Sequence, residues 1–282
     1  MDRLLAVYGL LVMLIALTRL DQPGMGWIIV AHAMVPLLAW LATRARHDGV
    51  GGLLRGIYPV AILLGLYGSL DILNGFGAAP VHDAAIQRIE AALFGMQPAR
   101  DWWRSVISPG WSRVMHSVYL SYYLVVPMPL VVLALRRQWE GMTRYLDGMI
   151  ALFLFCYLCY ILWPVAGPYY EFARPTGVFV ANLPAQLVYD GLARGSSFGA
   201  AFPSSHVAAT LAAAVGGWRV DRVLGVVLMV PAVLLAIGVV YCQMHYAIDS
   251  ITGVIVGITI PLAVHRLQQG SQRQAGSSAP PD

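Results

Sequence analysis

Long stretches of almost uninterrupted apolar residues alternate with short polar segments along most of this 282-residue chain. A helix that crosses a bilayer needs about 20 mainly apolar residues, with a range of about 17 to 25. Eight segments meet this requirement, so both ends of the chain are expected on the same side of the membrane. The predicted spans are residues 4–20, 26–43, 57–76, 114–135, 149–167, 202–218, 223–241 and 246–264.

These spans predict an all-α, polytopic membrane bundle with no second domain. Two spans within residues 1–56 precede a six-helix core at 57–265. Long loops at 77–113 and 168–201 interrupt the core. The tail at 266–282 is polar and of low complexity, and is expected to be disordered.

The composition supports a membrane protein. Apolar residues make up 59% of the chain and charged residues 11%, against about a quarter charged in an ordinary soluble domain. With a mean hydropathy of +0.68, these values exclude a soluble enzyme, a disordered chain and a nucleic-acid binder. The net charge of +4 therefore does not indicate nucleic-acid binding. No nucleic-acid partner is expected, and the bilayer is the expected partner.

All 18 basic residues are arginines, and their placement predicts the orientation. Eleven fall on the side of the two termini. Of the other seven, six lie in the two long loops. Short loops decide topology, so the termini are expected in the cytoplasm and the long loops outside it. The absence of lysine is typical of a GC-rich genome and favours a bacterial plasma (inner) membrane.

The first long loop contains one segment with helical periodicity. In residues 82–95 the apolar side chains of Ala85, Ile89, Ala92 and Leu93 recur at helical spacing. This spacing is typical of an amphipathic helix lying in the membrane interface. A packed connector between spans would give the same pattern, so both interpretations stay open.

The sixth predicted span opens with a segment suited to anion binding, Pro203-Ser204-Ser205-His206. Proline suits the first helical turn, and serine suits the cap. Free amides and the positive end of the helix dipole at such a start attract an anion. A capped helix with an interfacial histidine is the alternative.

The eighth span opens with His245 and Asp249, which lie on one helix face because they are four residues apart. The carboxylate can accept a proton from one imidazole nitrogen and leave the other free as a nucleophile or base. A structural, buried histidine–aspartate pair would look the same.

The topology brings these groups to one membrane face. His206 and His245 are separated by one descending and one returning span, and Arg174 lies in the loop before the sixth span. An arginine and helix amides bind phosphate, while two imidazoles can divide the work of nucleophile and general acid. We expect phosphoryl transfer through a phosphohistidine, with no metal and no cofactor. Zinc bound by His206, His245 and Asp249 is an alternative that leaves the phosphate-binding features unused.

At these positions the sequence resembles the type 2 phosphatidic acid phosphatase superfamily of membrane lipid phosphatases and phosphotransferases. Arg174-Pro175 matches the end of the family's first signature, Pro203–His206 matches the second with serine for glycine, and His245 with Asp249 matches the end of the third. Two cations of the signatures are absent: Gly167 stands in place of lysine and Gly238-Val239 in place of Ser-Arg. The resemblance covers about residues 57–265 and implies a catalytic six-helix core.

Within this superfamily, the segments WPVAGPYY (163–170) and FPSSHVA (202–208) most resemble the inositol phosphorylceramide synthase and inositolphosphotransferase branch. This likeness implies transfer of a phosphoalcohol such as phosphoinositol from a phospholipid donor to a lipid alcohol. The superfamily at large implies hydrolysis of a lipid monophosphate or diphosphate, with water as acceptor. Fewer cations suit a phosphodiester, which carries less charge than a monoester.

Four further residues are candidates for hydrogen bonds to the phosphate: Ser204, Ser205, Gln243 and Tyr169. For each, a helix cap or an interfacial aromatic is an alternative role.

A different class of function, a transporter or scaffold without catalysis, would instead use polar residues within the spans. The candidates for such a path are His32, Asp71, Asn74 and His116.

Overall fold

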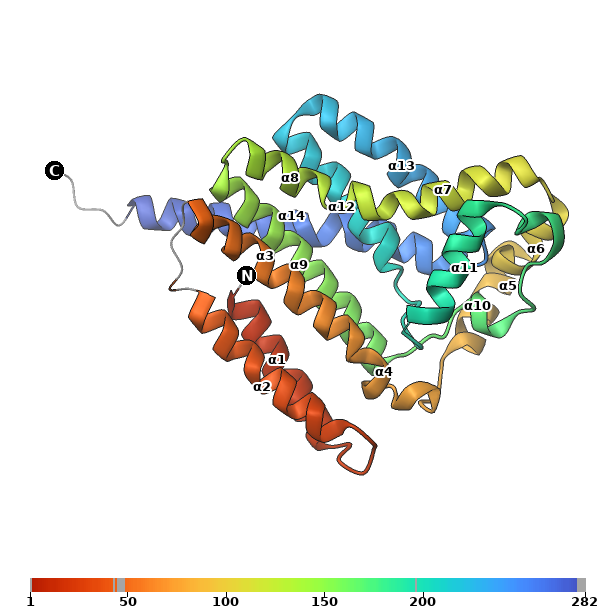
Figure 1. Ribbon diagram of the computed structural model, residues 1–282, viewed down its shortest axis with the longest axis horizontal. Coiled ribbons are helices and arrows are strands. Elements are labelled where there is room, and N and C mark those ends of the chain that lie inside the picture. The colour runs from red at the N-terminus through yellow and green to blue at the C-terminus, as the bar shows by residue number, and fades with distance from the viewer. Residues whose placement is uncertain (1, 43, 45–48, 196, 278–282) are drawn as a thin grey trace.

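The computed structural model describes residues 2–42, 44, 49–195 and 197–277. Every regular element in these residues is a helix, apart from one isolated bridge between Val165 and Ala200. The predicted all-α, polytopic membrane fold is therefore confirmed (Figure 1). In chain order the helices are α1 (Asp2–Leu17), α2 (Met25–Ala42), α3 (Gly49–Gly68), α4 (Leu70–Leu73), η1 (Gly75–Gly77), α5 (Asp83–Phe94), α6 (Pro98–Ser105), α7 (Pro109–Val125), α8 (Met128–Leu135), α9 (Trp139–Leu162), α10 (Pro168–Glu171), η2 (Gly177–Phe179), α11 (Leu183–Gly195), α12 (Ser205–Val220), α13 (Arg222–Tyr241) and α14 (Ala247–Ser277).

A helix is present at each of the eight predicted spans. Within the described residues, six segments are long and apolar enough to cross a membrane. The other two helices at predicted spans, α1 and α12, have 16 residues each. The six segments are Met25–Ala42, Ile57–Gly77, Pro109–Leu135, Trp139–Leu162, Arg222–Tyr241 and Ala247–Gly270.

Prolines account for two differences from the predicted boundaries. The fourth predicted span is divided into α7 and α8, because Pro127 has no amide hydrogen to continue the first helix and instead caps the second. The fifth, predicted at 149–167, is α9, which starts at Trp139 and ends at Leu162. The residue before a proline is disfavoured in a helix, so Trp163 leaves the helix ahead of Pro164.

The two ends of the predicted core also differ. Helix α3 starts at Gly49 rather than near residue 57. Helix α14 continues to Ser277, so residues 266–277, expected to be disordered, are helical. Gln, Arg and Ala are good helix formers and prolong the last span. The last residue of the second predicted span, residue 43, and the end of the tail, 278–282, lie outside the described residues.

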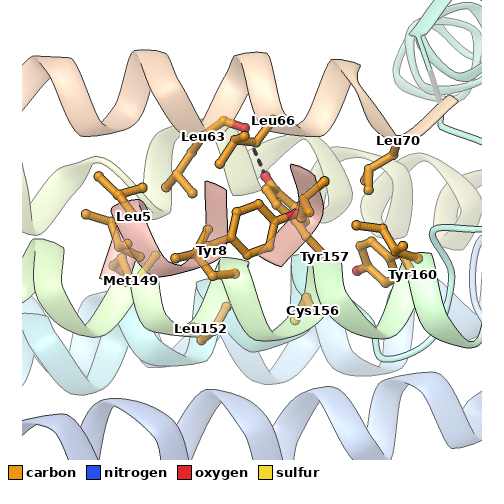
Figure 2. Close-up of a cluster of buried hydrophobic side chains, with 14 of the residues drawn as sticks. Leu5, Tyr8, Leu63, Leu66, Leu70, Met149, Leu152, Cys156, Tyr157 and Tyr160 are labelled. Atoms are coloured by element: carbon orange, nitrogen blue, oxygen red, sulfur yellow. Dashed lines mark hydrogen bonds between the residues drawn. The ribbon is translucent and has the colours of Figure 1, made fainter. Parts of the chain in front are cut away.

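The first two helices form a hairpin that packs on the rest of the bundle. Leu5 and Tyr8 of α1 lie in one buried cluster with α3 and α9 (Figure 2). Within this cluster the hydroxyl of Tyr157 on α9 donates to the carbonyl oxygen of Leu63 on α3, at 3.3 Å. Helix α9 is therefore one of the elements on which the N-terminal hairpin packs, together with α3 and α4.

Helices α12 and α14 approach closely where α14 carries Gly253 and Gly257. A Cβ atom at Gly253 would lie 2.7 Å from the carbonyl oxygen of Ser204, and one at Gly257 would lie 2.5 Å from that of Ala208. Glycines four residues apart allow helices in a membrane to pack backbone to backbone. This contact sets the start of α12, with His206, beside the start of α14.

The long loops fold into short helices. Helices α5, α6, α10 and α11 gather at one end of the bundle, away from the C-terminal end of the chain (Figure 1). Helix α5 corresponds to the predicted amphipathic segment. It buries Asp83, Ile86 and Glu90 against the protein and exposes Ile89 and Leu93. The helix therefore packs on the bundle with one face and presents apolar side chains outward with another.

Candidate active site

His245 lies in the connection between α13 and α14, with 5% of its surface exposed. Its Nδ1 donates to the carbonyl oxygen of Ala201 at 3.0 Å. A carbonyl can only accept, so Nδ1 carries the hydrogen and Nε2 carries the lone pair. Burial lowers the pKa of His245 to about 4, although the bond to Ala201 acts in the opposite direction. The imidazole is therefore neutral near pH 7 and holds its lone pair on Nε2.

Asp249 lies beside this histidine, but its main hydrogen bond is made elsewhere. Oδ2 of Asp249 is 3.5 Å from Nδ1 of His245 and accepts a hydrogen bond from the amide of Tyr246 at 2.8 Å. The carboxylate thus caps the start of α14. The sequence correctly places the two side chains together; the partner that fixes the tautomer is the backbone of Ala201.

The carbonyl of Ala201 is held in place by the isolated bridge. The amide of Ala201 donates to Val165 at 3.0 Å, and the amide of Val165 donates to Gly199 at 3.1 Å. Gly167 follows at a φ of +96°, where a Cβ atom would lie 2.9 Å from that of Ala201. A side chain at position 167 would be strained and would collide with Ala201. The glycine found in place of the family's lysine thus suits the backbone that orients His245.

His206 lies in the first turn of α12, next to His245. The centroids of the two rings are 5.8 Å apart. Nε2 of His206 lies 3.3 Å from the hydroxyl of Tyr119, and the ring of Tyr122 packs on its other side at 4.6 Å. Two imidazoles at this separation can contact one bound phosphoryl group from different directions.

Ser204 and Ser205 support the start of α12. The side chain of Ser204 caps the helix by accepting from the amide of Val207 at 3.4 Å, and its own amide donates to the carbonyl of Asp249 at 3.0 Å. The amide of Ser205 donates to the hydroxyl of Tyr160 at 3.2 Å. The amides of Ser204, Ser205 and Val207 thus have partners within the protein, so the helix start offers fewer free donors to an anion than its sequence suggests.

Arg174 and Tyr169 contact each other beside the site. The guanidinium of Arg174 lies over the ring of Tyr169, 4.4 Å from its centroid, and Arg174 is exposed while Tyr169 is buried. The adjacent carbonyl, that of Ala173, accepts from Arg104 at 2.9 Å and from Gln243 at 3.1 Å. Arg104 of α6 is thus a second cation at this loop, which the sequence analysis did not select.

Gln243 is fully buried and holds the loops together. Its Oε1 accepts from the indole of Trp103 at 2.9 Å and from Arg104 at 3.3 Å, while its Nε2 donates to the carbonyls of Pro168 and Ala173. These four contacts use both ends of the amide, so the structure gives Gln243 a positioning role. Gln243 also has a φ of +57°, at the sharp turn that leads from α13 to His245.

The outer helix α5 supports the same region through two buried carboxylates. Asp83 accepts from the amides of Ala166 and Gly167, both at 2.7 Å. Glu90 accepts from the amide of Ile248, at 3.2 Å, and so helps to cap α14. The signal in the sequence was two acids seven residues apart on one helix face, Asp83 and Glu90.

A tyrosine-rich apolar cavity of about 500 Å³ opens beside His206. Ser205 and His206 form one end of its lining. The rest comes from α3, α7, α8, α9 and α11, and includes tyrosines and aliphatic residues of several helices. Such a cavity suits the hydrocarbon part of a ligand whose polar group reaches the histidines. Its tyrosines are Tyr67, Tyr119, Tyr122, Tyr123, Tyr145 and Tyr157.

The structure also bears on the two alternatives from the sequence. In the described part of the chain, no three His, Cys, Asp or Glu side chains are grouped as a metal site, so the zinc alternative finds no ligand set there. The residues of the transport alternative contact backbone atoms. His32 contacts Ile28 and His116 contacts Ser112 within their own helices, while Asp71 and Asn74 contact the distant Phe198. These contacts are structural.

Comparison with known proteins identifies the family. A family profile described as the PAP2 superfamily matches residues 84–263, from α5 to α14. No match was found among curated proteins or among solved structures. The matched segment contains both histidines, Asp249 and Arg174, and its apolar helices fit a membrane lipid phosphatase or phosphotransferase. Because this match spans more than half of the sequence, the chain belongs to the PAP2 superfamily.

Proposed function

We propose that this protein is a membrane lipid phosphotransferase that works through a phosphohistidine on His245. The observation that carries the proposal is the pair formed by His245 and His206 next to the apolar cavity. His245 has its hydrogen fixed on Nδ1 by Ala201, at 3.0 Å, and presents Nε2 as a lone-pair donor. His206 lies close by, with a ring separation of 5.8 Å, and lines the cavity that would hold the lipid.

In the proposed reaction, Nε2 of His245 attacks the phosphorus of a phospholipid. The N–P bond forms, the bond from phosphorus to the glycerol oxygen breaks, and His206 in its imidazolium form gives a proton to the leaving alkoxide and becomes neutral. In the second half, His206 takes the proton of an acceptor hydroxyl. That oxygen attacks phosphorus, and the bond to His245 breaks. Arg174, with Arg104 close by, would neutralise phosphate charge at the loop, while Asp249 and Ser204 hold the two helix starts.

We further propose a phosphodiester donor, with a phosphoalcohol head group such as phosphoinositol and a lipid alcohol as acceptor. Support comes from the two missing cations of the family signatures, at Gly167 and Val239, and from the close packing at Gly167 that excludes a side chain. One observation favours the alternative, hydrolysis of a lipid phosphomonoester: Arg104 adds a cation near Arg174, as a more highly charged substrate would require.

The placement in the membrane is also a proposal. The arginine count puts both termini in the cytoplasm, which would place the histidines at the outer face of a bacterial plasma membrane. Selective cleavage of an exposed site in the loop at 168–201, from outside spheroplasts, would support this orientation.

The reaction can be tested with a phospholipid labelled at phosphorus, incubated with purified protein with and without a lipid alcohol. Transfer predicts labelled acceptor lipid that appears only when the alcohol is present. A labelled water-soluble product alone, in both incubations, would reject the transferase and support hydrolysis. A ³²P label on the protein that is stable in alkali and labile in acid would identify the phosphohistidine.

The proposed role of His245 as nucleophile can be tested separately from its hydrogen bond to Ala201. His245→Asn retains a side-chain N–H at the position that bonds to Ala201 but has no Nε2, so we expect a folded protein with turnover lowered by about 10⁴-fold or more, in the range seen when a nucleophile is removed. His245→Ala removes both groups and serves for comparison. Turnover near the wild-type rate in the His245→Asn variant would reject the mechanism.

A further inference from the structure

A second cavity, of about 840 Å³, lies at the opposite end of the bundle from the histidines. It is bounded by α9, α12 and α14 and by the turn between α8 and α9. The elements that line it are near the C-terminal half of α14, far from the loop helices α5, α6, α10 and α11 (Figure 1). Its lining shares Tyr145 and Met149 with the cavity beside His206 and includes none of the residues that take part in the proposed bond changes.

The mouth of this cavity is strongly basic. Arg137, Arg144, Arg219 and His265 line it, and Glu140 is the only acidic residue among its lining residues. Glu140 pairs with Arg144 at 3.4 Å, and its side chain is 72% exposed. Within the described residues, no ion pair involves Arg137 or Arg219, so these two guanidiniums are available to an anionic ligand.

The inner wall of the cavity is apolar. It is formed by Met149 of α9, Ala212 and Val215 of α12 and Pro261 of α14. Gly216 contributes to the hollow because a Cβ atom there would lie 2.8 Å from the ring of Tyr145. A cationic mouth above an apolar wall is complementary to a ligand with an anionic head and a hydrocarbon chain.

We propose that this cavity binds an anionic phospholipid from the leaflet at the arginine-rich end of the bundle. Its phosphate would contact Arg137, Arg144 and Arg219, and one acyl chain would lie along Met149 and Ala212. Basic pockets between membrane helices are known to hold anionic head groups. Arginine also suits phosphate because its planar guanidinium can give two parallel hydrogen bonds.

Membrane proteins in general carry an excess of positive residues on their cytoplasmic side. The test must therefore distinguish a binding site from a merely positive surface. We compare two double variants that remove equal charge. Arg137→Gln with Arg219→Gln removes two cations of the cavity. Arg222→Gln with Arg266→Gln removes two exposed arginines at the same end that do not line it.

Binding is measured by native mass spectrometry and by thermal unfolding in detergent. The added ligands are phosphatidylglycerol, phosphatidylcholine or inorganic phosphate. We expect the wild type to prefer phosphatidylglycerol. The cavity variant should lose about 5-fold in this preference for each arginine removed, or about 25-fold in total, while the control variant retains it.

An equal loss in both variants would overturn the site, because it would show attraction by surface charge alone. Protection of the wild type by inorganic phosphate as strong as that by phosphatidylglycerol would overturn the lipid as ligand. Should the cavity variant fail to fold, a photoactivatable phosphatidylglycerol is cross-linked to the wild type instead. Labels on residues 137–144, 212–220 and 261–265 would support the proposal, and labels confined to other segments would overturn it.

Discussion

Replacement of Glu90 by glutamine tests the support that α5 gives to the active site. Glu90 is fully buried and accepts from the amide of Ile248. Burial raises its pKa from 4.5 to about 7, and the negative charge of Asp249 adds to this, while the amides of Ile248 and Ala247 oppose it. The folded protein therefore keeps the proton of Glu90 at pH values where the unfolded chain has lost it.

The sign and size of the effect on stability follow from linkage. The pKa of Glu90 is higher in the folded protein than in the unfolded chain. Protonated Glu90 therefore makes its full contribution to the free energy of unfolding below about pH 4.5, and this contribution is lost as the pH rises to about 7. The difference between pKa values of 4.5 and 7 corresponds to about 3 kcal/mol. Glutamine has no proton to lose and retains an acceptor for Ile248. The free energy of unfolding of Glu90→Gln, relative to wild type, should therefore rise by about 3 kcal/mol between pH 4 and pH 8.

The assay is unfolding in detergent, followed by the fluorescence of the eight tryptophans, at several pH values. The matched control is Glu140→Gln, which removes a glutamate with a 72% exposed side chain at the other end of the bundle. We expect this control to differ from wild type by nearly the same amount at every pH. A difference between Glu90→Gln and wild type that does not change from pH 4 to pH 8 would contradict a raised pKa of Glu90 in the folded protein.

Two further predictions concern the position of His206. Gly257→Ala places a Cβ atom 2.5 Å from the carbonyl oxygen of Ala208, so it should lower the free energy of unfolding by about 1–3 kcal/mol and reduce turnover by separating α12 from α14. The control is Gly65→Ala in α3, where no atom lies within 4 Å of the new Cβ. This variant should instead raise the free energy of unfolding by about 0.5–1 kcal/mol. Equal effects in the two variants would contradict the close contact between α12 and α14. Tyr119→Phe removes the hydroxyl that lies 3.3 Å from Nε2 of His206. It should lower kcat by about 3- to 10-fold with a shifted pH profile, whereas an unchanged profile would show that the tyrosine only fills space.

The apolar segments predicted the helices because a span is a local property of length and hydropathy. The predicted helix boundaries differ from the observed ones at Pro127 and Pro164. A helix break there depends on one proline, whereas the prediction rests on the average hydropathy of a whole segment. The polar composition after residue 265 predicted disorder, but α14 continues to Ser277. Helix propensity there outweighed polarity.

The histidines were the most readily predicted part of the candidate site. Topology alone predicts His206 and His245 at one membrane face, and the four-residue spacing predicts Asp249 beside His245. His245 lies just before α14 rather than on its face, since the helix starts at Ala247. Arg104 and Glu90 were not selected, since each reaches the site from a loop helix whose docking the sequence does not specify. A GxxxG pattern at Gly253 and Gly257 was a usable signal for the contact of α12 with α14.

The amino-acid sequence alone predicts a polytopic helical membrane protein with two histidines, an aspartate and an arginine toward one face. Hydropathy, helical period and span count are enough for that. Which nitrogen of His245 is free depends on the packing of distant segments, because the carbonyl of Ala201 lies 44 residues away along the chain. The tertiary structure also gives the amides at the start of α12 internal partners and opens an apolar cavity at His206. These features depend on contacts between distant segments, which no local pattern encodes.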